Sequence, residues 1–167
     1  MTRAFDSLAA GLDYPMVIVT VGVGGERSGC LVGFTTQCSI EPPRWLVCVS
    51  KVNHTHGVAV GAGAMAVHFP TPAECAVAAL FGEETGDEVD KFARCSWRPW
   101  DGDGQTPVLE EVGRRFVGRV VERFDAGDHT AFVLDVVDAA YAPGPQLGFQ
   151  QVKDMPPGHP PEEAAAG

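Results

Sequence analysis

The sequence predicts a mainly β protein, a small Greek-key β-barrel with short helices between its strands. Roughly six apolar runs have the length of a strand, and most of them are rich in β-branched residues. The segments with helical spacing that separate these runs are short. Strands and helices do not alternate regularly, which argues against a doubly wound parallel sheet.

The N-terminal part of the chain predicts a short helix followed by a β-hairpin. Apolar residues at helical spacing predict a helix over residues 5–12, which a following proline ends. A run of valine, isoleucine and threonine predicts a strand over residues 16–23. Gly22 and then Gly24-Gly25-Glu26-Arg27 supply a turn, and residues 29–34 form the returning strand.

The next segment predicts two further strands with a helix between them. Residues 35–39 continue extended but polar, and a double proline then marks a loop or a sheet edge, because proline cannot donate to a strand ladder. Residues 45–49 are nearly all apolar and predict a strand buried on both faces. Residues 54–61 form a short helix that an asparagine or threonine caps, and residues 64–69 form another strand.

The clearest helical pattern begins at Thr71 or Pro72 and stops at Gly82, with an apolar stripe along one side. An acidic connector follows over residues 83–92. Residues 97–106 predict a long loop that carries two tryptophans, which must find cover in the core or on a partner chain.

The last strands lie over residues 116–124 and 130–137, joined by a tight turn. Beyond them the chain becomes rich in proline, alanine and glutamate, a composition that cannot build a core. We therefore expect a barrel domain over residues 1–150 and an exposed tail over residues 151–167.

The composition excludes several classes of partner. The net charge of 167 residues is −10, so neither nucleic acid nor an anionic membrane surface is expected to bind, because both require a basic face. No targeting or membrane-spanning segment is visible. Five cysteines show no metal-ligand spacing, and Cys30, Cys38 and Cys48 are interpreted as small buried side chains. These features favour a reducing, cytoplasmic setting.

Two common motifs of enzymes are missing from the sequence. The chain has no Gly-x-Ser-x-Gly nucleophile elbow, and its glycine-rich turn opens no helix, so the dinucleotide fingerprint fails. His54 and His56 have no third ligand at a suitable spacing, and we expect no metal. His129 follows Gly127 and Asp128 in a turn, where a histidine is more often plain surface.

The segment from Ser28 to Thr55 is the best candidate for a binding site. It holds small and hydroxyl residues between two apolar strands and ends at a helix start. Small residues let a flat ligand approach the main chain closely, and hydroxyls beside a helix start suit a phosphate. The pattern therefore predicts a flat, phosphate-bearing cofactor along a strand edge.

Taken together, these motifs resemble the flavin reductase-like family, the FMN-binding split barrels. The resemblance spans about residues 10 to 140 and rests on the order and spacing of four segments. They are Gly29-Cys30-Leu31-Val32-Gly33-Phe34, Cys38-Ser39-Ile40-Glu41-Pro42-Pro43, Ser50-Lys51-Val52-Asn53-His54-Thr55 and Gly127-Asp128-His129. Here Cys30-Leu31 replaces the Met-Thr that is usual in the family, and Gly33 replaces a serine.

The resemblance implies a homodimer that binds FMN or FAD at its interface and takes hydride from NADH or NADPH. It implies His129 near the reacting face of the flavin, where it orients the nicotinamide or aids proton transfer. The cofactor-binding residues implied for the ring, the ribityl chain, the phosphate and a supporting cation are Leu31, Val32, Gly33, Phe34, Thr35, Thr36, Ser39, Ser50, Lys51, Asn53, Thr55 and Lys91.

The expected function is an NAD(P)H-dependent flavin oxidoreductase that supplies reduced flavin to a partner oxygenase, the last step being implied by the family. One alternative is a split barrel that binds flavin or a deazaflavin without reductase turnover. Another is an interaction module with Trp97 and Trp100 as its partner surface. The sequence leaves open whether the flavin is a prosthetic group or a diffusing substrate.

Overall fold

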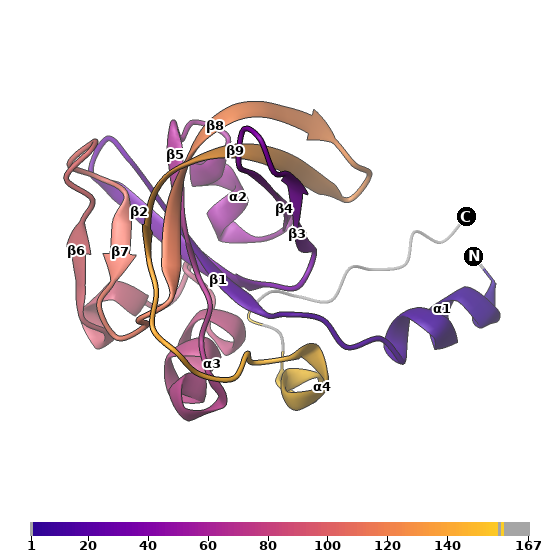
Figure 1. Ribbon diagram of the computed structural model, residues 1–167. Helices are drawn as coiled ribbons and strands as arrows, with labels where there is room; N and C mark the ends of the chain where they lie inside the picture. Colours follow the sequence, from indigo (N-terminus) through magenta and orange to yellow (C-terminus); the bar gives the residue numbers. More distant parts are fainter. Residues whose placement is uncertain (1, 157, 159–167) are drawn as a thin grey trace.

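Seven strands of the computed structural model form one antiparallel sheet in the order β2-β1-β5-β8-β9-β4-β3 (Figure 1). The structure describes residues 2–156 and 158. The strands are β1 (Val17–Val23), β2 (Glu26–Val32), β3 (Thr35–Ser39), β4 (Arg44–Ser50), β5 (Ala64–His68), β8 (Arg115–Asp125) and β9 (His129–Ala140). The predicted mainly β class is confirmed, with the sheet closing into a split barrel.

The connection between β2 and β3 forces the sheet to curl. These two strands are the opposite edges of the sheet, yet only Gly33 and Phe34 separate them. Three consecutive Cα steps span at most about 11 Å. The two edges must therefore meet, and we call this junction, residues 32–35, the seam.

The β1–β2 hairpin forms as predicted, although β2 begins earlier than expected. Val23 pairs with Glu26, so Gly24 and Gly25 alone make the turn. Both have a positive φ, 59° and 86°, the conformation that a two-residue hairpin turn of this kind requires and that glycine adopts most readily.

Two hydrophobic clusters cover the two faces of β1. Val17, Val19 and Val21 point into the barrel, where they pack with residues of β2, β4, β5, β8 and β9. Ile18 points outward into a second cluster with Val77 and other residues of the helical layer. Because both faces are covered, β1 carries apolar residues on both of them and is interrupted only by Thr20 and Gly22.

The helices lie outside the barrel, apart from α2 (His54–Ala59), which packs against β1 and β2. Helix α3 (Cys75–Glu83) follows the 3₁₀ turn η1 (Pro72–Glu74) and covers β2, and Figure 1 shows α4 (Phe149–Val152) near it. The turn η2 (Lys91–Arg94) follows the acidic connector. Helix α1 (Arg3–Ala10) projects away from the barrel and buries none of its residues (Figure 1).

Four expectations about local structure are wrong. The segment predicted as a loop over residues 97–106 contains the strand β6 (Trp97–Pro99), which pairs with β7 (Pro107–Leu109). Helix α3 runs through Gly82 to Glu83, and its Cys75 is exposed. His129 does not lie within the turn but opens β9.

The fourth concerns β4, which is not buried on both faces. Only Val47 and Val49 are fully buried, and the other residues of the strand are half-buried. The strand therefore has one face in the barrel and one partly open to solvent. The interpretation of the cysteines also needs correction, since Cys30 is buried but Cys48 is half-buried and Cys38 is exposed.

The expected tail over residues 151–167 falls partly outside the described residues. Within its described part, Val152 is buried in the second cluster and Met155 packs against it. No helix in residues 2–156 has both the length and the apolar character needed to cross a bilayer.

Candidate functional site

A cavity of about 230 Å³ opens at the seam between β2 and β3. Seven of the residues predicted to bind a cofactor or act in catalysis line this seam cavity: Leu31, Val32, Gly33, Phe34, Ser50, Asn53 and His129. They come from β2, the seam itself, the end of β4, the cap of α2 and the start of β9. The curl of the sheet thus gathers residues that are far apart in the chain.

The main chain at the seam is accessible because β2 is an edge strand. β2 pairs with β1 on one side only, so the backbone groups on the other side of residues 31–33 have no strand partner within the described part of the chain, whereas the Phe34 carbonyl accepts a hydrogen bond from the Cys48 amide at 2.9 Å. A Cβ atom on Gly33 would lie 2.5 Å from Cε2 of Tyr14, so no larger residue fits there without moving the ring. Glycine therefore lets an aromatic side chain pack directly on the seam backbone.

An aromatic group forms one wall of the seam cavity. The rings of Tyr14 and Phe149 are stacked, with centroids 4.8 Å apart and planes at 12°. Phe34 lies 5.1 Å from the ring of His129 and is 56% exposed. Such a wall is suited to a flat, conjugated ligand, because aromatic rings stack on one another favourably.

The polar groups of the seam cavity sit at the end of β4. Ser50 Oγ is buried and has no hydrogen-bond partner among residues 2–156 and 158. Asn53 caps α2, its side chain accepting a hydrogen bond from the Thr55 amide at 2.9 Å. A buried hydroxyl without a partner is rare in a folded protein, so Ser50 indicates a ligand that would satisfy it.

His129 is oriented by the residue before it. Its Nδ1 lies 2.6 Å from Oδ1 of Asp128. A carboxylate only accepts hydrogen bonds, so Nδ1 carries the proton. This leaves Nε2 as the ring nitrogen that can accept or exchange a proton in the cavity.

The two thiols that line the seam cavity are not reactive groups. Burial raises the pKa of Cys30 to about 11 and also raises the pKa of Cys48. Both are therefore neutral near pH 7, and a neutral thiol is a poor nucleophile. The chemistry that this cavity supports is the binding of a flat ligand beside a histidine.

Besides Lys91, five of the predicted cofactor-binding residues do not line the seam cavity, and these five all have partners within the protein. Thr35 Oγ1 donates to the Leu46 carbonyl at 2.9 Å, and Lys51 Nζ pairs with Asp125 and the Gly127 carbonyl. Thr55 Oγ1 lies 2.9 Å from Ser28 Oγ and is buried. The hydroxyl of Thr36 and the carbonyl of Ser39 take part only in local hydrogen bonds.

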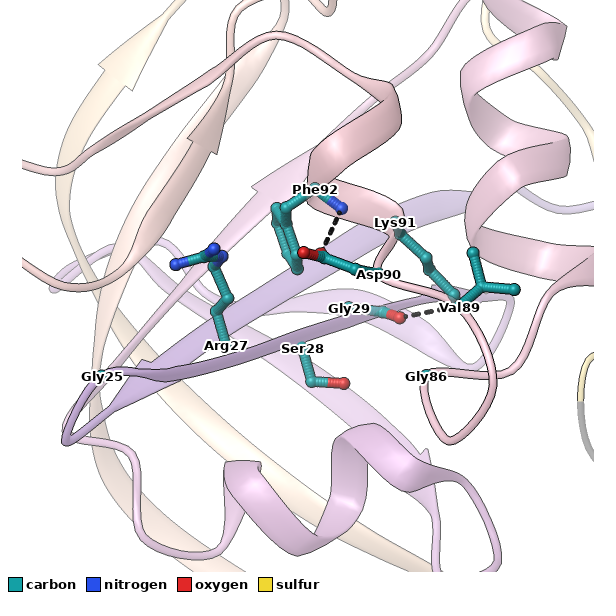
Figure 2. Close-up of a pocket in the computed structure, with 9 residues that line it drawn as sticks. All are labelled: Gly25, Arg27, Ser28, Gly29, Gly86, Val89, Asp90, Lys91 and Phe92. Carbon is teal, nitrogen blue, oxygen red and sulfur yellow. Dashed lines mark hydrogen bonds between the residues drawn. The ribbon is translucent and has the colours of Figure 1, made fainter.

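Lys91 lines a different cavity, of about 210 Å³, which we call the lysine cavity (Figure 2). Its other lining residues belong to the β2 end of the hairpin, to the segment before η2 and to η2 itself: Gly25, Arg27, Ser28, Gly29, Gly86, Val89, Asp90 and Phe92. Residues 27–29 of β2 line the lysine cavity and residues 30–32 line the seam cavity, so the two cavities follow one another along a single strand.

Lys91 is a buried cation that contacts only neutral groups. It is 5% exposed, and its Nζ donates to the carbonyls of Gly29 and Phe81, both at 3.1 Å. No ion pair within residues 2–156 and 158 involves it. Burial lowers the pKa of this amine. An ammonium held in this way favours an anion in the cavity that it lines.

Sequence reasoning missed several residues of both cavities. Tyr14 and Phe149 form the aromatic wall of the seam cavity, and Arg27 and Phe92 line the lysine cavity. Tyr14 and Phe149 lie far apart in the chain, and nothing local marks them as neighbours. The sequence did contain a signal for Arg27, because a charged residue close to a hairpin turn on an edge strand can contact a ligand bound along that strand.

A family model described as a flavin reductase-like domain matches residues 9–154 of this chain. Among related proteins, the ferric-chelate reductase (NAD(P)H) of Archaeoglobus fulgidus is 29% identical over 77% of this chain and 76% of its own length. The FMN reductase (NADH) RutF of Variovorax paradoxus is 30% identical over 74% of this chain and 67% of its own. HsaB, the reductase subunit of a flavin-dependent monooxygenase from Mycobacterium tuberculosis, is 33% identical over 59% of this chain, which spans about half (52%) of HsaB.

Solved structures show the same fold. A flavin reductase domain protein from Arthrobacter superposes with a TM-score of 0.78 at 18% identity, covering 87% of this chain and 88% of its own. The NADH:FAD oxidoreductase SgcE6 of Streptomyces globisporus gives 0.76 at 24% identity, over 86% and 84% of the two chains. An FMN-binding protein of Thermus thermophilus gives 0.71 at 25% identity, over 77% and 71%.

Proposed function

The chain belongs to the flavin reductase-like domain family, and from this premise we propose that it is an NAD(P)H-dependent flavin oxidoreductase that binds FMN or FAD and reduces it by hydride transfer. The observation that carries the proposal is the seam cavity. It combines accessible main chain at Leu31–Gly33, an aromatic wall and a buried Ser50 hydroxyl without a partner. These features fit the flat ring and polar chain of a flavin.

Each element of the seam cavity has a role in this proposal. The backbone of residues 31–33 binds the polar edge of the ring, and Ser50 and Asn53 bind the polar chain attached to it. The stacked pair of Tyr14 and Phe149 closes the cavity on one side and keeps water out. A bound flavin supplies the acceptor for the hydride of NADH or NADPH. The protein contributes mainly by holding the two rings in contact.

His129 is the proposed catalytic residue. Its Nδ1 donates its proton to Asp128, and its Nε2 is therefore the atom that orients the nicotinamide or transfers a proton. Either role requires the ring to stay at the seam cavity, where Phe34 packs against it.

Lys91 is the proposed cation for the flavin phosphate. Thr55 and Lys51 were also predicted to act there, but each already has a partner in the protein. Lys91 instead contacts two neutral carbonyls in a cavity that continues the line of the seam cavity along β2. A phosphate at this position gives the buried ammonium an opposite charge.

The test is a reduction assay with both nucleotides and both flavins. Added FMN or FAD is expected to lose its fluorescence on binding, and NADH or NADPH is expected to bleach the visible absorbance of the flavin. Binding without bleaching by either nucleotide leaves a flavin-binding split barrel without reductase turnover. In that case the same assay with a deazaflavin tests the remaining alternative.

The interaction-module alternative loses its main support. Trp100 is only 7% exposed and its Nε1 donates to Asp138 at 3.0 Å, so it is not a surface residue as that alternative requires. Trp97 packs against Phe92 at a centroid distance of 5.6 Å. No specific observation favours this second function.

We also propose a homodimer that passes reduced flavin to a partner oxygenase. The exposed apolar residues Phe5, Leu8 and Leu12 of the N-terminal segment support self-association, because helix α1 has no cover of its own. A sedimentation experiment that finds a monomer at micromolar concentration refutes the dimer. The oxygenase partner is suggested by relatives such as HsaB and, like the cytoplasmic setting, stays a prediction.

A further inference from the structure

Two cations, Lys91 and Arg27, and one carboxylate, Asp90, line the lysine cavity, and Asp90 Oδ1 accepts a hydrogen bond from the Phe92 amide at 3.1 Å. Lys91 and Arg27 both line this cavity, although the chain as a whole carries a net charge of −10. A local pair of cations in so acidic a protein does not follow from composition. The two cations differ in their surroundings, and this difference indicates what each one binds.

Lys91 lies at the inner side of the cavity. An ammonium has three donors, and the carbonyls of Gly29 and Phe81 accept two hydrogen bonds from it. One donor is therefore left for a ligand. Because Lys91 is nearly buried, the group it binds must reach well into the cavity.

Arg27 lies at the mouth of the cavity with its donors unused. Its guanidinium lies 4.6 Å from the centroid of the Trp97 ring and 5.8 Å from that of Phe92. The five N–H groups of a guanidinium lie in its own plane, so stacking on a ring does not occupy them. No side-chain hydrogen bond or ion pair of Arg27 occurs within the described part of the chain. The aromatic rings thus hold a planar anion receptor in place.

The view in Figure 2 shows Arg27 and Lys91 on opposite sides of the Phe92 ring, above the strand that carries Ser28 and Gly29. The strand connects this cavity to the seam cavity. Val32 at the seam and Arg27 are five residues apart on β2, a separation of roughly 17 Å for an extended chain. Each cavity alone is smaller than the 300–1,000 Å³ that is usual for a small-molecule site, so one long ligand that occupies both suits them better than one short ligand.

We propose that this protein selects FAD over FMN, with Lys91 binding the phosphate that the two flavins share and Arg27 binding the second phosphate that only FAD has. The inference rests on the proposed flavin reductase function and adds the identity of the flavin. Arg27 is then the residue that determines specificity, and the Phe92 and Trp97 rings position it.

The experiment compares the dissociation constants of FMN and FAD, measured by fluorescence quenching, for wild type and Arg27→Gln. Glutamine retains part of the side chain that packs on the rings but carries no charge. Wild type is expected to bind FAD at least tenfold more tightly than FMN, a difference of about 1.4 kcal/mol. Arg27→Gln is expected to lose most of this preference. Its dissociation constant for FAD should rise about tenfold, and its dissociation constant for FMN should change less than about twofold.

Arg94→Gln is the matched control, because Arg94 is an exposed arginine of η2 that does not line either cavity. This variant makes the same change of charge nearby and is expected to bind both flavins as wild type does. Equal affinity of wild type for FMN and FAD overturns the inference, as does a preference that survives Arg27→Gln. Equal weakening of FMN and FAD by Arg27→Gln also overturns it, since Arg27 would then bind the shared phosphate. If neither flavin binds, the proposed function itself fails, and the inference fails with it.

Discussion

Replacing Lys91 by methionine tests whether the lysine cavity binds the flavin phosphate. Methionine has a similar length, so Lys91→Met removes the charge of the ammonium while filling most of its space. In the structure the Nζ atom contacts only the carbonyls of Gly29 and Phe81, so no ion pair is broken. A hydrogen bond to a charged group contributes about 1.5–3 kcal/mol. FMN should therefore bind about 10- to 150-fold more weakly to the variant.

The assay is a fluorescence titration of wild type and Lys91→Met with FMN and with riboflavin. Riboflavin has the same ring and ribityl chain but lacks the phosphate, so it is the internal control. Its affinity should change by less than about threefold, because Lys91 does not line the seam cavity where the ring is proposed to bind. A urea titration measures the free energy of unfolding and checks that the variant is folded.

Two results would refute this reasoning. If Lys91→Met weakens the binding of riboflavin as much as the binding of FMN, the lysine supports the fold of β2 and does not bind the phosphate. If FMN binds to the folded variant with unchanged affinity, the phosphate lies elsewhere, and the helix cap at Asn53 becomes the better candidate.

Two further predictions concern histidines. His129→Ala should slow flavin reduction by NADH about 10- to 100-fold in stopped-flow measurements while changing the dissociation constant of the flavin less; a loss of flavin affinity alone would make His129 a ligand contact and not a catalytic residue. His68 is fully buried, accepts a hydrogen bond from the Leu109 amide at 2.9 Å, and has its pKa lowered to about 4 by burial. The unfolded chain therefore binds this proton more tightly, and a stabilisation of roughly 3 kcal/mol present above pH 6.5 should be lost as the pH falls to 4. Urea titrations of wild type and His68→Gln check this, and equal pH dependence of the two would contradict it.

The strands were predictable from the sequence because their signals are local. The β-branched run of β1 and the glycine pair that turns it into β2 specify a hairpin without reference to the rest of the chain. Asn53 likewise caps α2 through a contact two residues away. Where the local signal was weak, the prediction failed, as for β6, a strand of three residues.

The seam was only partly predictable. Residues 31–34 could be assigned to an edge, because they precede a polar segment and a double proline. That Ser50 and His129 would lie at the same edge depends on the pairing of β4 with β9, in which these two residues are partners. The resemblance to a known family implied that both residues belong to one cofactor site, and the residues alone did not.

By itself, the sequence determined the class of the fold and one segment that lines the seam cavity. Both depend on patterns within ten or so residues, which chain geometry converts directly into strands, turns and caps. Only the tertiary structure decided that Tyr14 and Phe149 form the wall of the seam cavity, and that Lys91 and Arg27 share a second cavity along the same strand. These neighbours come from different parts of the chain, and their contacts arise from the order in which the strands pair and from the curl that brings β2 to β3. The burial of a charge beside neutral carbonyls has no local signature, because it depends on what the rest of the chain packs around it.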